Sequence, residues 1–262
     1  MNFEIDGKQG YAFTGGRTLD PSKPSVMFVH GAAMDHTVWA LPTRYFVRHG
    51  YNVLSVDLPG HGRSEGPPAA TLSDAADWVI RVLHAAGLER TALVGHSMGS
   101  LVALEAAARH PDQVRSLVLI GSAVPMAVTD ALLKNAQADD HLAIDMLTIW
   151  GYSRGAQLGG NETPGMWMVG GTMRLLERSA PGILYNDLNA CNEYRHGMDS
   201  AKQVQCPTML ILGDEDMMTP PVRGKDIAGA IPDSRIVLLK SSGHSLMSEK
   251  PDAVLDALIE IV

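Results

Sequence analysis

The segment at residues 95–99 has the pattern G-x-S-x-G and carries the clearest chemical signal in the chain. A short apolar run at 91–94 precedes it, and an alanine-rich segment at 100–108 follows it. A serine between a strand and a helix, with glycines two residues away on both sides, is typical of a nucleophile elbow, a turn too tight for larger side chains. Ser97 is therefore predicted to be the nucleophile of an acyl-transfer reaction.

A serine hydroxyl reacts only when a base takes its proton and a third group orients that base. Asp214, Asp216 and His244 follow Ser97 in the chain, and they lie just after two further apolar runs. The order Ser, Asp, His is that of elbow-type hydrolases. We predict His244 as the base and Asp216 as the acid, with Asp214 as the alternative.

Acyl transfer also needs hydrogen-bond donors for the oxyanion that forms on the carbonyl oxygen. The residue after the nucleophile supplies one backbone N–H, and the loop after an early strand supplies the other. Met98 and Ala32 occupy these positions. Their backbone N–H groups are predicted to form the oxyanion hole.

Short apolar runs alternate with segments of helical length along most of the chain. The runs span residues 25–29, 51–56, 91–94, 116–120, 208–212 and 235–239. Nearly unbroken apolar runs suit strands that are buried on both faces of a parallel sheet. Together with an N-terminal hairpin around Asp6-Gly7, they predict an α/β fold with a mostly parallel central sheet flanked by helices.

The alternation lapses between residues 124 and 200, where no strong strand signal occurs. We predict that residues 1–123 and 201–262 form the core and that 124–200 form a helical insertion. Its place between two sheet strands predicts a lid over the carboxyl edge of the sheet, where α/β proteins bind ligands.

Composition excludes several classes of function. The 262 residues are 45% hydrophobic and 19% charged, with a formal net charge of -8 and scattered basic residues. This balance argues against binding to nucleic acid or to an anionic membrane. No signal-peptide pattern and no membrane-length apolar stretch occurs, and the two cysteines have no disulfide or metal spacing. We expect a soluble cytoplasmic protein, and the sequence leaves its oligomeric state open.

The chain resembles the α/β-hydrolase superfamily over nearly its whole length, most closely capped serine esterases and lactonases. The likeness rests on the elbow, on His30-Gly31, on the block at 57–64, on Gly213-x-x-Asp216 and on Gly243-His244. It implies that the block beginning at Asp57 is a structural turn. It also implies that His30 and His61 are framework residues, and that His96 packs beside the nucleophile.

The resemblance further implies that the insertion is a cap whose apolar side chains line the substrate pocket. The candidate wall residues are Met146, Trp150, Met166, Trp167 and Met168, with Met218 from the acid loop. Methionine and tryptophan would make an adaptable apolar wall. No group of the ten histidines has metal-ligand spacing, so neither a metal nor a cofactor is predicted.

The expected reaction is hydrolysis of small to medium carboxylic esters or lactones. A serine nucleophile disfavours dehalogenases and epoxide hydrolases, which resemble this superfamily but need a carboxylate. Hydrolysis of a carbon–carbon bond by the same triad is one alternative. The other is a receptor that keeps the fold and binds a small molecule without turnover, since fold alone does not fix function.

Overall fold

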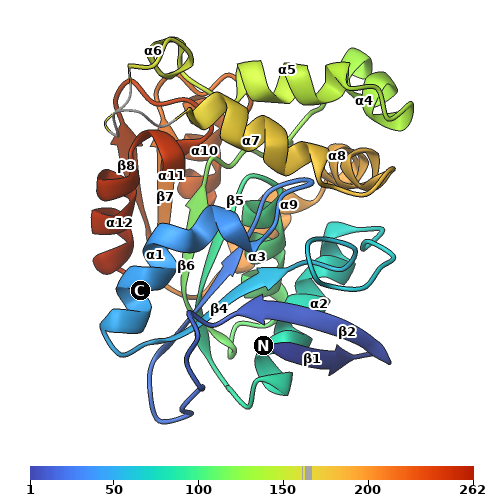
Figure 1. Cartoon of the computed structure of the whole chain (residues 1–262). Helices are drawn as coiled ribbons and strands as arrows, with labels where there is room; N and C mark the ends of the chain where they lie inside the picture. Colours follow the sequence, from blue (N-terminus) through green and yellow to red (C-terminus); the bar gives the residue numbers. More distant parts are fainter. Residues whose placement is uncertain (161, 163–166) are drawn as a thin grey trace.

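The computed structural model describes residues 1–160, 162 and 167–262, and its centre is an eight-stranded sheet (Figure 1). The strands are β1 (Asn2–Ile5), β2 (Lys8–Phe13), β3 (Ser25–Val29), β4 (Asn52–Asp57), β5 (Thr91–His96), β6 (Val114–Ile120), β7 (Thr208–Gly213) and β8 (Ser234–Leu239). They lie in the order β1-β2-β4-β3-β5-β6-β7-β8. The pairs β1–β2 and β2–β4 are antiparallel, and all other neighbours in the sheet are parallel. The mostly parallel sheet confirms the predicted fold class.

Each predicted apolar run coincides with a strand. The central strands are covered on both faces as predicted, whereas the run at 235–239 forms β8, an edge strand that is only partly buried. In β3, Val26 and Phe28 pack in the core on one side of the sheet, while Met27 and Val29 pack in the core on the other. All four side chains are fully buried. Alternate residues of a strand point to opposite faces, so a strand buried on both sides must be apolar throughout.

Two layers of helices provide this cover (Figure 1). One core contains residues of α2 (Leu72–Ala85), α3 (Met98–Arg109), α9 (Gly197–Gln203) and α10 (Pro221–Ala230). The other contains residues of the short 3-10 helix η1 (His36–Trp39) and of α1 (Ala40–Arg48), α11 (Leu246–Glu249) and α12 (Pro251–Ile259). Within the described ranges, no helix has the length and hydropathy needed to cross a membrane.

The predicted hairpin opens the chain. Asp6 and Gly7 connect β1 to β2 with φ angles of 53° and 73°. Positive φ at both central residues is the requirement of the tight turn that matches the twist of two antiparallel strands, and Asp-Gly suits it.

The insertion is helical. It contains α4 (Asp130–Gln137), α5 (Leu142–Trp150), α6 (Arg154–Gln157), α7 (Met168–Glu177), α8 (Ile183–Glu193) and the start of α9. In the described part of residues 124–200 there is no strand, and α4, α5, α7 and α8 lie over the carboxyl ends of the strands (Figure 1). These four helices share a small apolar core with Ala33 of the loop after β3. The predicted boundary at residue 200 falls inside α9, which packs on α3.

Candidate active site

Ser97 lies at the turn between β5 and α3, with φ of 53° and ψ of -123°, a strained conformation for a residue with a side chain. The turn depends on two glycines. A Cβ added at Gly95 would lie 2.0 Å from the carbonyl oxygen of Gly99, and one added at Gly99 would lie 2.3 Å from that of Val29. The N–H of Ser97 donates to the carbonyl oxygen of Ile120 at 2.9 Å. The local geometry is that of a nucleophile elbow.

His244 follows β8 and meets Asp216, which follows β7. The Nδ1 atom of His244 lies 2.8 Å from Oδ2 of Asp216. The hydroxyl of Thr219 donates to the same oxygen at 2.6 Å, and the N–H groups of Met218 and Thr219 donate to Oδ1. Burial alone would raise the pKa of Asp216, but His244 and these donors outweigh it and hold the pKa below its ordinary value. The ionised carboxylate therefore accepts the Nδ1–H of His244.

Asp214, the alternative acid, makes a different contact. Its Oδ2 atom lies 3.5 Å from Nζ of Lys240, whose side chain is largely exposed. Of the two candidate acids, the fold brings Asp216 to His244.

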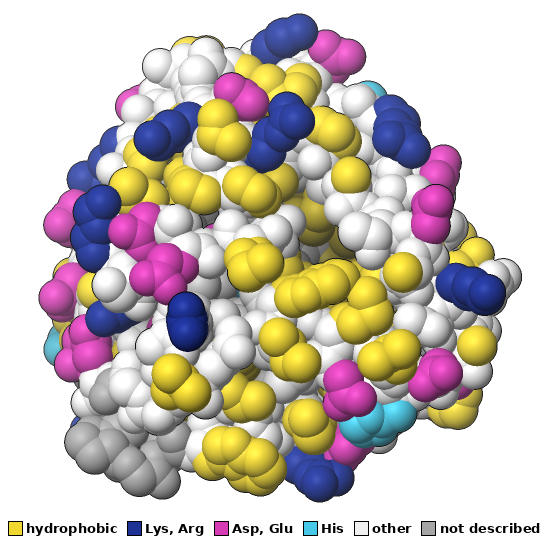
Figure 2. All heavy atoms as spheres, turned by 90° about the horizontal axis from the view of Figure 1, so that it is seen from above, with side chains coloured by type: hydrophobic (Ala, Val, Ile, Leu, Met, Phe, Trp, Pro, Cys, Tyr) yellow, Lys and Arg dark blue, Asp and Glu magenta, His cyan; other side chains and the backbone are white. Residues whose placement is uncertain are grey.

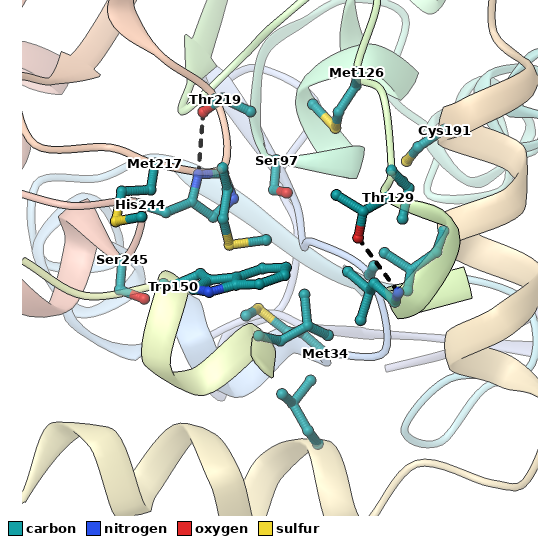
Figure 3. A pocket seen from close by; sticks show the side chains of 18 of the residues that line it. Met34, Ser97, Met126, Thr129, Trp150, Cys191, Met217, Thr219, His244 and Ser245 are labelled. Carbon is teal, nitrogen blue, oxygen red and sulfur yellow. Dashed lines mark hydrogen bonds between the residues drawn. The ribbon is translucent and has the colours of Figure 1, made fainter. Parts of the chain in front are cut away.

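The second ring nitrogen of His244 is available to act as a base. Its Nε2 atom is buried and has no hydrogen-bond partner within the part of the chain that the structure describes. Figure 3 shows the imidazole between Thr219 and the side chain of Ser97. Because Nδ1 carries the proton that Asp216 accepts, Nε2 presents its lone pair on the side of the serine.

His96, the neighbour of Ser97, holds the backbone of His244. Its Nε2–H donates to the carbonyl oxygen of His244 at 2.9 Å, and the two rings are 4.9 Å apart. Burial and the nearby His244 lower the pKa of His96 to about 3. His96 therefore stays neutral at ordinary pH.

The loop after β3 passes directly beside Ser97. A Cβ added at Gly31 would lie 3.2 Å from Cβ of Ser97. The next residue, Ala32, lines the same cavity as Ser97. Among the described residues, no acceptor takes the N–H of Ala32 or of Met98. Both backbone groups proposed for the oxyanion hole are therefore free to donate to a ligand, as far as the described residues go.

A cavity of about 140 Å³ lies above Ser97 and His244 (Figure 3). Its lining is mainly thioether, aromatic and aliphatic, with three hydroxyl groups beyond the serine and the acid loop. The largest apolar residues are Met34, Met126, Leu132, Leu147, Trp150, Leu176, Leu188, Met217 and Met218, and the hydroxyls are those of Thr129, Thr172 and Ser245. Within the described residues, no Asp, Glu, Lys or Arg lines the cavity.

Two of the proposed wall residues, Trp150 and Met218, line this cavity. Met146 instead packs in the apolar core of the cap, where its sulfur accepts a hydrogen bond from Asn135 at 3.6 Å. Met166 lies outside the described residues.

Trp167 and Met168 also lie away from the cavity. The side chain of Trp167 is 70% exposed and lies on Gly170, where an added Cβ would approach the indole to 2.1 Å. Met168 is buried in a separate small cluster with Tyr152 and Ala156. Trp167 belongs with other exposed apolar residues of the insertion, including Ile149 and Leu158. Figure 2 shows apolar side chains spread across the cap face.

Several residues of the site were not predicted. Met34, Met126 and Cys191 line the cavity from three different segments, and the sequence offers no pattern that groups them. Thr219 is different: an aspartate that accepts N–H groups two and three residues further on is a common turn motif. The spacing of Asp216 and Thr219 was therefore a usable signal.

The turn that begins at Asp57 is held by hydrogen bonds. Its carboxylate accepts the N–H and Nδ1–H of His36 at 2.7 and 2.8 Å, and the N–H of Arg63 at 2.9 Å. In the described chain, Asp35, His36 and Asp57 form one group spaced closely enough for a metal ion. The oxygens of Asp35 accept hydrogen bonds from Thr37 and from Arg178 at the end of α7, so the carboxylate oxygens of this group are already engaged.

A buried carboxylate joins the loop of the candidate base to the insertion. Glu249 of α11 accepts the N–H of Gly243 at 3.0 Å and the N–H of Ser153 at 3.2 Å. Nearby, the N–H of Ser245 donates to the carbonyl oxygen of Gly151 at 2.8 Å. Burial raises the pKa of Glu249 above its ordinary value. The segments on both sides of His244 are therefore fixed to the cap backbone.

Residues 26–257 match the model of the alpha/beta hydrolase family, and the chain belongs to that family. It is similar to the (E)-2-((N-methylformamido)methylene)succinate hydrolase of Acinetobacter baylyi, at 25% identity over 89% of this chain and 88% of the relative. It is also similar to a Pseudomonas savastanoi protein named as a carbamate hydrolase, RutD, at 29% identity over 85% of this chain and 87% of the relative. Among solved structures, the enol-lactonase of Burkholderia xenovorans LB400 has the same fold, with a TM-score of 0.87 at 19% identity over 99% of this chain and 98% of that one.

We expect Asp216 to make stability depend on pH in the acid range. A folded-state pKa below the ordinary value of 3.8 means that the ionised carboxylate stabilises the fold above that pH. This stabilisation is lost as the pH falls through the folded-state pKa. The free energy of unfolding that separates the wild type from Asp216→Asn should therefore be constant at neutral pH and shrink below about pH 4. Urea unfolding at a series of pH values measures it, and a difference that does not change with pH would contradict the prediction.

Proposed function

We propose that this chain is a serine hydrolase that cleaves small to medium carboxylic esters or lactones through an acyl-enzyme on Ser97. One observation carries the proposal: His244 is bonded to the Asp216 carboxylate through Nδ1, and its Nε2, which has no partner among the described residues, faces the serine in an apolar cavity. This is the arrangement in which an imidazole takes a hydroxyl proton.

In the proposed reaction, Nε2 of His244 accepts the proton of Ser97 while the serine oxygen attacks the ester carbonyl. The N–H groups of Ala32 and Met98 donate to the oxyanion of the tetrahedral intermediate. As the intermediate collapses, the imidazolium gives its proton to the departing alcohol oxygen. Water then attacks the acyl-enzyme with His244 again as base, and the acid and free serine are released. The Asp216 carboxylate stabilises the imidazolium in both halves.

The cavity lining favours an uncharged acyl group. Its large side chains are apolar, and no cation among the described lining residues would neutralise a carboxylate. A buried carboxylate without such a partner is costly. The succinate named for the Acinetobacter relative is therefore a poor fit, and neutral esters and lactones are the class that we propose.

Replacing Ser97 by alanine should abolish the reaction. We expect turnover of an activated ester to fall about 10³-fold or more in Ser97→Ala, because the nucleophile is removed while the fold remains. A serine-reactive phosphonate followed by mass spectrometry of peptides identifies the modified residue in the wild type. An adduct on another residue would overturn the assignment, and a single modification event without product release would favour the receptor alternative.

The two candidate acids give a matched pair of variants. Asp216→Asn should lower turnover by roughly 10⁴, because an amide no longer fixes the tautomer of His244 or stabilises its charged form. Asp214→Asn should change turnover little, since Asp214 faces Lys240. Steady-state kinetics on one ester compares them directly, and the reverse ranking would transfer the role to Asp214.

Alanine variants of two tryptophans in the insertion test whether the cavity wall selects the acyl group of the substrate. Trp150→Ala enlarges the cavity and should shift the preferred acyl group toward longer chains. Each methylene-sized difference between two esters should change their relative kcat/KM by an amount equivalent to about 1–3 kcal/mol. Trp167→Ala is the control, because Trp167 is exposed outside the cavity. The measurement is kcat/KM for a graded series of esters. Parallel profiles for Trp150→Ala and the wild type would remove Trp150 from the specificity wall.

A further inference from the structure

Asp187 on α8 reaches from the cap into the loop beside the nucleophile. Its side chain is buried, and its Oδ2 atom accepts the backbone N–H of Ala33 at 2.9 Å. The same oxygen lies 2.7 Å from Nε2 of His61. One carboxylate oxygen of the cap is thus shared by two groups of the core.

The geometry makes His61 a cation. Its Nε2 atom meets the Asp187 carboxylate, and its Nδ1 atom lies 3.0 Å from the carbonyl oxygen of Pro59. Both neighbours are acceptors, so both ring nitrogens donate. Burial and the ring of His30, 4.9 Å away, disfavour the charge, but Asp187 and the more distant Asp57 outweigh them and raise the pKa of His61. The negative charge on Asp187 is therefore matched within the pair.

The residue held by Asp187 is strained. Ala33 has φ of 54°, in the left-handed region that non-glycine residues rarely adopt, and this conformation costs roughly 1 kcal/mol or more. A strained residue keeps its geometry only when its surroundings hold it. The Asp187 carboxylate provides the side-chain hydrogen bond to the N–H of Ala33.

The strained residue directly follows Ala32. The orientation of the Ala32 N–H depends on the backbone torsions on both sides of it, so a relaxed Ala33 would turn the preceding peptide groups away from Ser97. A charge-assisted hydrogen bond is about twice as strong as a neutral one, and the charge of His61 offsets the repulsion that a lone carboxylate would exert on a nearby oxyanion.

We propose that Asp187, neutralised by His61, is a positioning residue that holds the loop after β3 so that the Ala32 N–H meets the oxyanion. The proposal rests on the proposed function, in which Ala32 is an oxyanion donor. By this proposal the cap lines the substrate pocket and also helps to position a donor for the oxyanion.

Three variants on neighbouring positions of α8 test this. Asp187→Ala removes the acceptor, and it should lower kcat about 10²-fold with KM within about twofold, as expected when one oxyanion donor is misplaced. Asp187→Asn keeps an amide oxygen without the charge, and it should lower kcat about tenfold. Asn186→Ala is the control, because Asn186 donates to the carbonyl oxygen of Ala69 at 2.9 Å and to Oδ1 of Asp187 at 3.3 Å, and its removal leaves Oδ2, the oxygen that binds Ala33 and His61, in place. Its kcat should equal that of the wild type.

Two further measurements distinguish a role of Asp187 in positioning the Ala32 N–H from a general loss of cap stability. The affinity for a trifluoromethyl ketone, which forms an anionic adduct on the serine, should fall in proportion to kcat/KM in the Asp187 variants and not in Asn186→Ala. Thermal unfolding of all three variants reports the accompanying loss of stability. Equal kcat for Asp187→Ala and Asn186→Ala, or a rise in KM at unchanged kcat, would overturn the proposal. If Asp187→Ala does not fold, an unchanged kcat in Asp187→Asn would overturn it.

Labelling of Ser97 by a serine-reactive phosphonate distinguishes failure of this proposal from failure of the proposed function. The reaction uses the same oxyanion donors and needs no knowledge of the natural ester. Rapid labelling of the wild type with about 100-fold slower labelling of Asp187→Ala supports both proposals. Equal rates would reject the role of Asp187 and leave the serine hydrolase intact, whereas a wild type that neither labels nor turns over esters would reject both.

Discussion

The close approach of three backbone segments around Ser97 is the constraint on which the rest of the site depends. Where α3 begins, a Cβ on Gly99 would lie 2.3 and 2.4 Å from the carbonyl oxygens of Val29 and His30. The end of β3, the turn after β5 and the first turn of α3 therefore meet without intervening side chains. This contact brings the serine, the start of a helix and the loop of Ala32 into one small volume, so backbone packing places the candidate nucleophile next to the loop of the proposed donors.

The candidate base is positioned in a different way, by side chains. Asp216 holds the ring nitrogen of His244, and His96 holds its carbonyl oxygen. Gly121, with φ of 56°, leaves room for the ring, since an added Cβ would lie 3.1 Å from Nδ1. Burial of these groups excludes competing water and makes each hydrogen bond count for more than it would at the surface. The imidazole is therefore held through Nδ1, and its other ring nitrogen, Nε2, is left to face the serine.

The core was predictable from sequence because its signals are local and strong. Strands such as β3 and β7 are covered on both faces, so their apolar runs are unbroken. Ser97 and Asp216 each follow a strand of this kind, and His244 follows the partly exposed edge strand β8. The walls of the cavity were less predictable. Trp150 and Trp167 belong to the same apolar insertion, yet Trp150 lines the cavity and Trp167 is exposed. The difference depends on how short helices pack against one another, and the hydrophobic periodicity of the sequence does not predict that packing. Asp187 was hidden for the same reason, because its partners lie more than a hundred residues away.

The hydrogen bonds through Glu249 connect the His244 loop to the cap, and they influence how far the cap sequence can vary. On the cap side, the groups that it and Ser245 engage are the N–H of Ser153 and the carbonyl oxygen of Gly151. Both belong to the main chain, so at residue 153 any amino acid except proline supplies the required donor. The hydrogen bonds of the attachment therefore depend on the main chain of the cap, although the Ser153 hydroxyl also accepts the N–H of Ala156 at 3.3 Å at the start of α6. An insertion anchored in this manner can exchange its pocket-facing residues while the loop that carries His244 keeps its support.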